Sequence, residues 1–97
     1  MIYLVFYDIT NTKSRTKVAN RLVDMGYERI QYSVFTGLND PVTNSNLWEF
    51  LKLNIDSECD KLYVLKVSKK AFKTMSKLGQ SGLDIDYFSG DRQSLFF

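Results

Sequence analysis

The hydrophobic pattern of the chain begins with a strand. The stretch MIYLVFYDI places bulky apolar residues on both faces and ends at Asp8, which is typical of a central strand buried on both sides. A helix is predicted next, because apolar residues recur there at intervals of three and four positions and Gly26 supplies a natural end. Its apolar stripe is Val18, Ala19, Leu22 and Met25, and its candidate N-caps are Thr10, Asn11 and Thr12.

The stretch ERIQYSVFTG, residues 28–37, predicts either one strand or two short strands joined at a kink. Side chains alternate between the two faces of a strand, so each face can be read from the sequence. We expect the face that covers the helices to consist of Ile30, Tyr32 and Val34. The opposite face would then carry Arg29, Gln31, Ser33 and an exposed Phe35.

The rest of the chain continues the alternation of helices and strands. A second helix is predicted by Leu47, Trp48, Leu51 and Ile55, a strand by DKLYVLKVS, and a third helix by Ala71, Met75 and Leu78 with Ser68 as its cap. The resulting order predicts an α+β fold, namely a ferredoxin-like βαββαβ sandwich with two helices on one face of an antiparallel sheet. The alternating segment LDIDYF and the final QSLFF predict an additional C-terminal strand or hairpin.

A length of 97 residues suits a single domain. Within it we expect a ferredoxin-like core at residues 1–79 and a dimerisation or partner-binding arm at residues 80–97. The arm ends in apolar side chains, which would remain exposed unless the segment docks on its own sheet or on a neighbouring chain. The candidate contact residues are Leu95, Phe96 and Phe97.

Composition narrows the possible chemistry. The chain contains no histidine, which excludes histidine general-base catalysis and histidine-ligated zinc or iron. Any hydrolysis must therefore use carboxylates and a hard cation. A single cysteine, Cys59, and the lack of a signal peptide or a long apolar run indicate a cytoplasmic protein without membrane contact.

The net charge of +2 is small, but the basic residues are grouped. Lys13, Lys17 and Arg21 share the polar side of the first helix. Together with Arg29 and with Lys69, Lys70, Lys73 and Lys77 of the third helix, they could contact phosphates. The alternative is an ordinary solvated helix surface.

Asp8 is the most conspicuous candidate for chemistry, because it ends an otherwise apolar strand. It could cap the following loop through backbone N–H groups, or it could bind Mg²⁺ or Mn²⁺. One chain supplies only this one obvious carboxylate, so a metal site requires a two-fold dimer that brings two copies together. Arg15 is expected to project toward Asp8, where its simplest role is an ion pair.

Several motifs together resemble one protein family. They are the pair Tyr7–Asp8 at the end of the first strand, the basic helix after it, the motif R-I-Q-x-S-V-F-x-G at residues 29–37, and KLG at residues 77–79. The chain resembles the smaller of the two universal CRISPR adaptation proteins, often described as the second CRISPR-associated endonuclease. The resemblance covers most of residues 1–79.

This resemblance implies a ferredoxin-like homodimer whose C-terminal strand often packs on the partner subunit, in a prokaryotic cytoplasm. It also implies a metal-dependent endonuclease acting on RNA or double-stranded DNA, and a bridge between dimers of the larger CRISPR integrase. The implied catalytic residues are Asp8, Arg15, Arg29 and Phe35, with Asp8 as the metal ligand at the dimer axis. The implied cofactor is Mg²⁺ or Mn²⁺.

The full set of nucleic-acid-binding residues that we predict is Tyr7, Lys13, Arg15, Lys17, Arg21 and Arg29. Lys17 stands where the family has a further basic position, and a lysine keeps the charge but lacks the fork that binds phosphate through two parallel hydrogen bonds. Three functions remain open: metal-dependent phosphodiester hydrolysis, a purely architectural DNA clamp that docks the integrase, and an RNA-binding ferredoxin-like module. The last lacks the usual aromatic signature.

Overall fold

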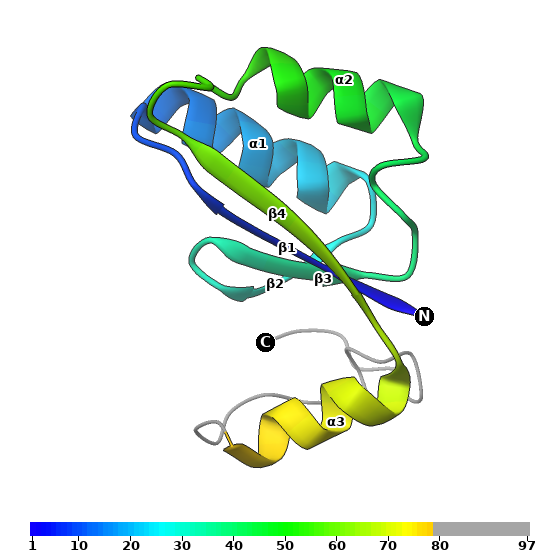
Figure 1. Cartoon of the computed structure of the whole chain (residues 1–97). Helices are drawn as coiled ribbons and strands as arrows, with labels where there is room; N and C mark the ends of the chain where they lie inside the picture. Colours follow the sequence, from blue (N-terminus) through cyan, green and yellow to red (C-terminus); the bar gives the residue numbers. More distant parts are fainter. Residues whose placement is uncertain (79–97) are drawn as a thin grey trace.

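The computed structural model describes residues 1–78 of the chain. The elements are β1 (Ile2–Asp8), α1 (Thr12–Asp24), β2 (Glu28–Gln31), β3 (Val34–Gly37), α2 (Ser45–Leu53), β4 (Lys61–Val67) and α3 (Lys69–Leu78). The four strands form one antiparallel sheet in the order β2-β3-β1-β4, with α1 and α2 on one side and α3 on the other (Figure 1). The predicted ferredoxin-like α+β fold is confirmed, whereas the proposed arm at residues 80–97 lies outside the described residues.

β1 is the central strand because it buries side chains on both faces of the sheet. Val5 and Tyr7 pack with α1 and α2 on one side, which we call the helix face. Ile2 and Leu4 pack with Phe72 of α3 on the other side, which we call the outer face. Because successive side chains of a strand alternate, Tyr7 points to the helix face and Asp8 to the outer face.

The ends of α1 follow the sequence prediction. The side chain of Asn11 accepts a hydrogen bond from the backbone N–H of Ser14 at 2.9 Å, which satisfies one of the donors at the start of the helix. Gly26 follows the helix with a φ of 94°, a left-handed conformation that a residue with a side chain rarely adopts. Between these ends the helix buries Val18, Ala19 and Leu22.

Each of the other two helices also begins directly after a capping residue. Asn44 caps α2, which buries Leu47 and Leu51 in the same core as α1. The hydroxyl of Ser68 accepts a hydrogen bond from the N–H of Ala71 at 3.0 Å, as predicted for α3. Ala71 itself is exposed, however, and Phe72 is the buried apolar side chain among residues 69–74 of α3. In the described residues no helix is both long and apolar enough to cross a membrane.

Residues 28–37 form two short strands, β2 and β3, with a turn at Tyr32 and Ser33 between them. The second of the two predicted alternatives is thus confirmed, but the predicted facing is wrong. Phe35 is fully buried on the helix face, Ile30 packs with the outer-face cluster, and Tyr32 is 67% exposed. Arg29 and Phe35 are cross-strand partners and do share a face, but burial of the phenyl ring turns that face toward the helices.

Gly37 ends β3 at a position where a side chain would not fit. A Cβ atom added there would lie 2.5 and 2.7 Å from two ring carbons of Tyr27. The ring of Tyr27 is buried, and its hydroxyl donates a hydrogen bond to the backbone carbonyl of Asn39, so the ring cannot move aside easily. The glycine is therefore a packing requirement of the loop that leads from β3 to α2.

We predict that Gly37→Ala lowers the free energy of unfolding by about 1–3 kcal/mol, the usual cost of overpacking a buried site. Chemical denaturation monitored by circular dichroism would measure the change. The same substitution in a Tyr27→Ala background should cost much less, because the side-chain carbons of Tyr27 that meet the new methyl group are then absent. Equal costs in the two backgrounds would contradict the steric explanation.

Candidate functional site

The loop after β1 is held in place by Asp60, the residue directly before β4. Its carboxylate accepts hydrogen bonds from the backbone N–H groups of Thr10 and Asp56, each at 2.9 Å. These two hydrogen bonds, the one from Thr10 first, lower the pKa of the Asp60 carboxyl. Asp60 thus has the loop-capping role that the sequence offered as the simpler function of Asp8.

Asp8 lies exposed on the outer face at the end of β1. Its side chain makes no hydrogen bond or ion pair within residues 1–78, although Lys61 is its cross-strand neighbour in β4. Beside it is an open hollow of about 310 Å³, lined by Phe6, Tyr7, Asp8, Lys61 and Tyr63. A carboxylate in this position can offer oxygen ligands to a hard cation without first breaking another interaction.

One chain does not complete a metal site from the residues that the structure describes. Among them there is no group of three or more acidic, cysteine or histidine side chains close enough to hold an ion. Mg²⁺ and Mn²⁺ bind through one or two carboxylates and keep several water molecules, so the Asp8 carboxylate fits one half of such a site. Any further protein ligand would have to come from outside the described residues of this chain.

Arg15 lies at the start of α1 and bonds to the loop rather than to Asp8. Its Nη1 donates to the carbonyl of Ile9 at 3.0 Å, and its Nη2 lies 3.3 Å from the Thr12 hydroxyl oxygen. The ion pair with Asp8 that the sequence suggested is not formed. These contacts instead hold the guanidinium at the β1–α1 loop, and the residue as a whole is half-buried.

Arg29 reaches the same region from β2. Its guanidinium carbon lies 5.0 Å from the ring centre of Phe35 and 5.4 Å from that of Tyr32. The guanidinium carbon of Arg15 lies 5.8 Å from the Tyr32 ring centre. Two cationic groups from different elements therefore meet at one tyrosine ring, close to the end of β1.

Tyr7 and Phe35 form a buried pair of rings beneath Arg29. Their ring centres are 6.1 Å apart, and the rings are stacked at an interplanar angle of 21°. Burial raises the pKa of the Tyr7 hydroxyl, and the nearby Arg29 guanidinium offsets part of that rise. The hydroxyl has no hydrogen-bond partner of normal geometry among the described residues. The expected exposure of Phe35 is wrong, and neither ring lies on the surface of the single chain.

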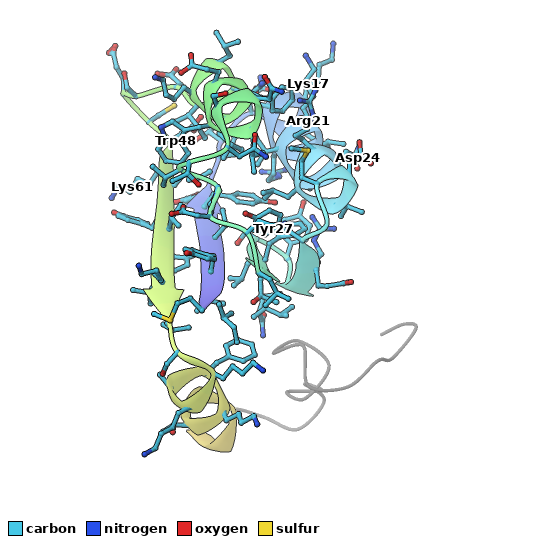
Figure 2. All side chains as sticks on the ribbon, turned by 90° about the vertical axis from the view of Figure 1, so that its right-hand side faces the viewer. Lys17, Arg21, Asp24, Tyr27, Trp48 and Lys61 are labelled. Atoms are coloured by element: carbon cyan, nitrogen blue, oxygen red, sulfur yellow. The ribbon has the colours of Figure 1, made fainter. Side chains whose placement is uncertain are left out.

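The predicted basic residues divide into separate groups. Lys13 and Lys17 are exposed on α1, but the guanidinium of Arg21 lies 3.9 Å above the ring centre of Phe50 in α2. Figure 2 places Lys17 and Arg21 beside the helix layer and Lys61 at the start of β4. Lys69, Lys70 and Lys73 belong to α3, on the other side of the sheet (Figure 1), so they do not extend the α1 surface.

Two residues of this region were not identified from the sequence. Asp60 acts on a loop 50 positions earlier in the chain, and the only local signal was an acidic residue directly before a strand. Tyr32 was predicted to face the helices, whether residues 28–37 formed one strand or two. A strand interrupted at Tyr32 and Ser33 would have placed it in an exposed turn.

The described residues define a ferredoxin-like α+β domain with an exposed carboxylate and a pair of arginines near one end of its central strand. Comparison with known proteins identifies the family, because residues 1–75 match the model described as CRISPR associated protein Cas2. The chain belongs to this family, as the sequence motifs had indicated.

Individual relatives show the same likeness. The CRISPR-associated endoribonuclease Cas2 2 of Pyrobaculum aerophilum is 38% identical over 79 residues, which cover 81% of this chain and 87% of that protein. The CRISPR-associated endoribonuclease Cas2 of Korarchaeum cryptofilum is 35% identical over 77 residues, which cover 79% and 83%. The crystal structure of Streptococcus pyogenes Cas2 at pH 6.5 matches with a TM-score of 0.63 and 28% identity, covering 84% of this chain and 100% of that one.

We predict that Asp60→Asn destabilises the protein, and that the loss depends on pH. Because the pKa of Asp60 is lower in the folded state, its contribution is fully present above the unfolded value of about 4 and disappears as pH falls through the folded value. Melting temperatures of the two proteins should therefore differ at neutral pH and converge in acid. Asp24→Asn, at the exposed end of α1, serves as the control for removing one negative charge. A difference that stays constant with pH would contradict the assignment.

Proposed function

We propose that the protein is a metal-dependent endonuclease that acts as a homodimer on RNA or double-stranded DNA during CRISPR adaptation. The observation that carries this proposal is the exposed, unengaged carboxylate of Asp8 at the end of β1, near which Arg15 and Arg29 meet on the other face of the sheet. The relatives named CRISPR-associated endoribonucleases support hydrolysis of a phosphodiester as the reaction. We further propose that the dimer binds the larger CRISPR integrase.

In this proposal Asp8 from each of two chains would hold Mg²⁺ or Mn²⁺. When bound, such an ion lowers the pKa of its water and offsets charge on the phosphate. Arg15 and Arg29 would bind the phosphodiester through their planar N–H groups and stabilise the extra negative charge that develops as water attacks phosphorus and a P–O bond breaks. Lys13 and Lys17 would add phosphate contacts along α1.

Two predicted site residues have a different place in this proposal. The buried rings of Phe35 and Tyr7 would support Arg29 from within the core, since Arg29 lies over Phe35 and Phe35 stacks on Tyr7. A direct contact of either ring with nucleic acid stays a prediction. Arg21 is left out of the proposed interface, because its guanidinium packs on Phe50.

The outer face would supply the dimer contact. Tyr63 and Leu65 of β4 are 55% and 48% exposed, and the ring centre of Tyr63 lies 5.7 Å from that of Phe6. Exposed apolar side chains grouped on a sheet face are typical of a protein contact surface. Asp8 lies on this same face, so a two-fold pairing across it would bring two copies of the carboxylate toward the axis. We propose that Leu95, Phe96 and Phe97 then pack on the partner subunit.

A second candidate function is architectural, with no chemistry of its own. The observation in its favour is that the sheet separates the proposed groups: Asp8 lies on the outer face, whereas Arg15 and Arg29 lie toward the helix face. In that case the arginines and lysines would hold duplex DNA, and the dimer would serve as a spacer between integrase subunits. Cleavage measurements on an Asp8 variant separate the two functions.

We predict that Asp8→Ala abolishes metal-dependent cleavage but leaves nucleic-acid binding unchanged and does not weaken the dimer measured with a chelator. The side chain is exposed and supports no other group among the described residues, so its removal should not alter the fold. Labelled single-stranded RNA and duplex DNA would be incubated with Mg²⁺, with Mn²⁺ or with a chelator. Asp24→Ala is the matched control, and the variant cleaving at the wild-type rate would reject the assignment. A wild-type protein that binds both ligands and cleaves neither would favour the architectural function.

We also predict that Leu65→Lys weakens the dimer by about 100-fold or more, because burying an unpaired ammonium group costs several kcal/mol. Cleavage should fall in parallel, since each chain supplies half of the proposed metal site. Sedimentation velocity at several concentrations would measure the change. Leu53→Lys is the matched control, because Leu53 is 83% exposed at the end of α2, on the other side of the sheet. Removing Gln93–Phe97 tests the arm separately, and unchanged sedimentation would argue against its proposed packing.

A further inference from the structure

We infer that Tyr32 is a positioning residue that holds Arg15 and Arg29 together as one phosphate-binding pair. This inference rests on the proposed function, because it takes the two arginines to be the groups that bind nucleic acid. Its starting point is the turn between β2 and β3, which places a large aromatic ring on the surface next to two cationic side chains.

The geometry distinguishes Tyr32 from an ordinary surface tyrosine. Its side chain is 67% exposed, so packing into the core does not account for its position. The guanidinium groups of Arg15 and Arg29 both lie within about 6 Å of the ring centre, the range in which the electron-rich face of an aromatic ring attracts a cation. Tyr32 is thus the residue that the two arginines share.

The two arginines differ in how firmly they are held. Arg15 is tied to the β1–α1 loop by its hydrogen bond to the carbonyl of Ile9. Arg29 comes from the edge strand β2, and the groups beneath its guanidinium are the rings of Phe35 and Tyr32. Because Phe35 is buried and fixed, Tyr32 is the contact that ties the position of Arg29 to that of Arg15.

Electrostatics explains why such a tie matters. Two guanidinium groups repel each other, and an arginine on an edge strand has open solvent into which it can turn. A shared ring attracts both cations and keeps them in place before any ligand is bound. Binding of a phosphate between them then requires less ordering of the two side chains, so pre-organisation strengthens affinity without a direct contact from Tyr32.

The experiment measures affinity for a labelled single-stranded RNA and for a duplex DNA, using wild type, Tyr32→Leu, Tyr32→Phe and Arg29→Ala. We expect Tyr32→Leu to weaken binding of both ligands by roughly fivefold to tenfold, the scale of a lost cation–π contact. Tyr32→Phe keeps the ring and should bind as wild type does. In an Arg29→Ala background, Tyr32→Leu should cause little further loss, because coupled residues are not additive.

Salt dependence gives a second readout that separates loss of pre-organisation from loss of a phosphate contact. Arg29→Ala removes a cation and should lower the slope of log affinity against log salt by about one, whereas Tyr32→Leu keeps both arginines and should leave the slope unchanged. Phe50→Leu is the matched control, since it removes a ring beneath Arg21, which is outside the proposed interface. Melting curves establish that each variant is folded.

Four outcomes would overturn the inference. In the first, Tyr32→Leu weakens binding in the Arg29→Ala background by the same factor as in the wild type. In the second, it weakens binding of single-stranded RNA but not of duplex DNA. Either result would mean that Tyr32 stacks on bases directly. Wild-type affinity of Tyr32→Leu, with Arg29→Ala still impaired, would overturn this inference alone. Wild-type affinity of both Arg15→Ala and Arg29→Ala would reject the proposed interface and this inference with it.

Discussion

The burial of β1 on both of its faces is the constraint on which the rest of the structure depends. This strand pairs with β3 on one edge and with β4 on the other, and its side chains enter two separate apolar clusters. Because side chains alternate along the strand, the last two side chains of β1 point in opposite directions. Tyr7 points into the core beneath the helices, and Asp8 points to the outer face. The separation of acid and arginines by the sheet follows from this alternation.

The two acidic residues near the end of β1 have opposite environments. The buried carboxylate of Asp60 accepts hydrogen bonds from two backbone N–H groups, and these hydrogen bonds compensate its charge. Asp8 is exposed, and its carboxylate accepts no hydrogen bond within residues 1–78. If Asp8 capped the loop itself, its oxygen atoms would be occupied and any cation would have to compete with the backbone. The presence of Asp60 is therefore what leaves the Asp8 carboxylate available.

Local features of the structure could be predicted from the sequence, and features that depend on distant residues could not. The cap at Ser68 and the stop at Gly26 each depend on a few neighbouring positions and were predicted correctly, and the cap of α1 is one of its three predicted candidates, Asn11. The face on which Phe35 lies depends on how β3 pairs with β1, and it was predicted wrongly.

The same distinction applies to the candidate site. The packing of Arg21 on Phe50 joins α1 to α2, and the hydrogen bond from the Thr10 N–H to Asp60 joins residues 50 positions apart, so neither leaves a periodic signal. Asp8, Arg15 and Arg29 were found through motifs, but their mutual arrangement was not: the expected ion pair of Arg15 with Asp8 is replaced by its bond to Ile9. The dimer and the residues of the arm stay predictions.

In the proposed dimer, the charge of Asp8 links assembly to cation binding. Two carboxylates brought close together repel each other, and this repulsion opposes any pairing that places both at the two-fold axis. A divalent cation held by both carboxylates would offset this repulsion, so that cation binding and dimerisation would favour each other. Lys61, the cross-strand neighbour of Asp8, provides a weaker positive charge on the same face. Tyr63 and Leu65 are exposed on the face that is proposed to form the dimer contact. Their packing against the partner subunit would then determine how closely the two Asp8 carboxylates approach each other.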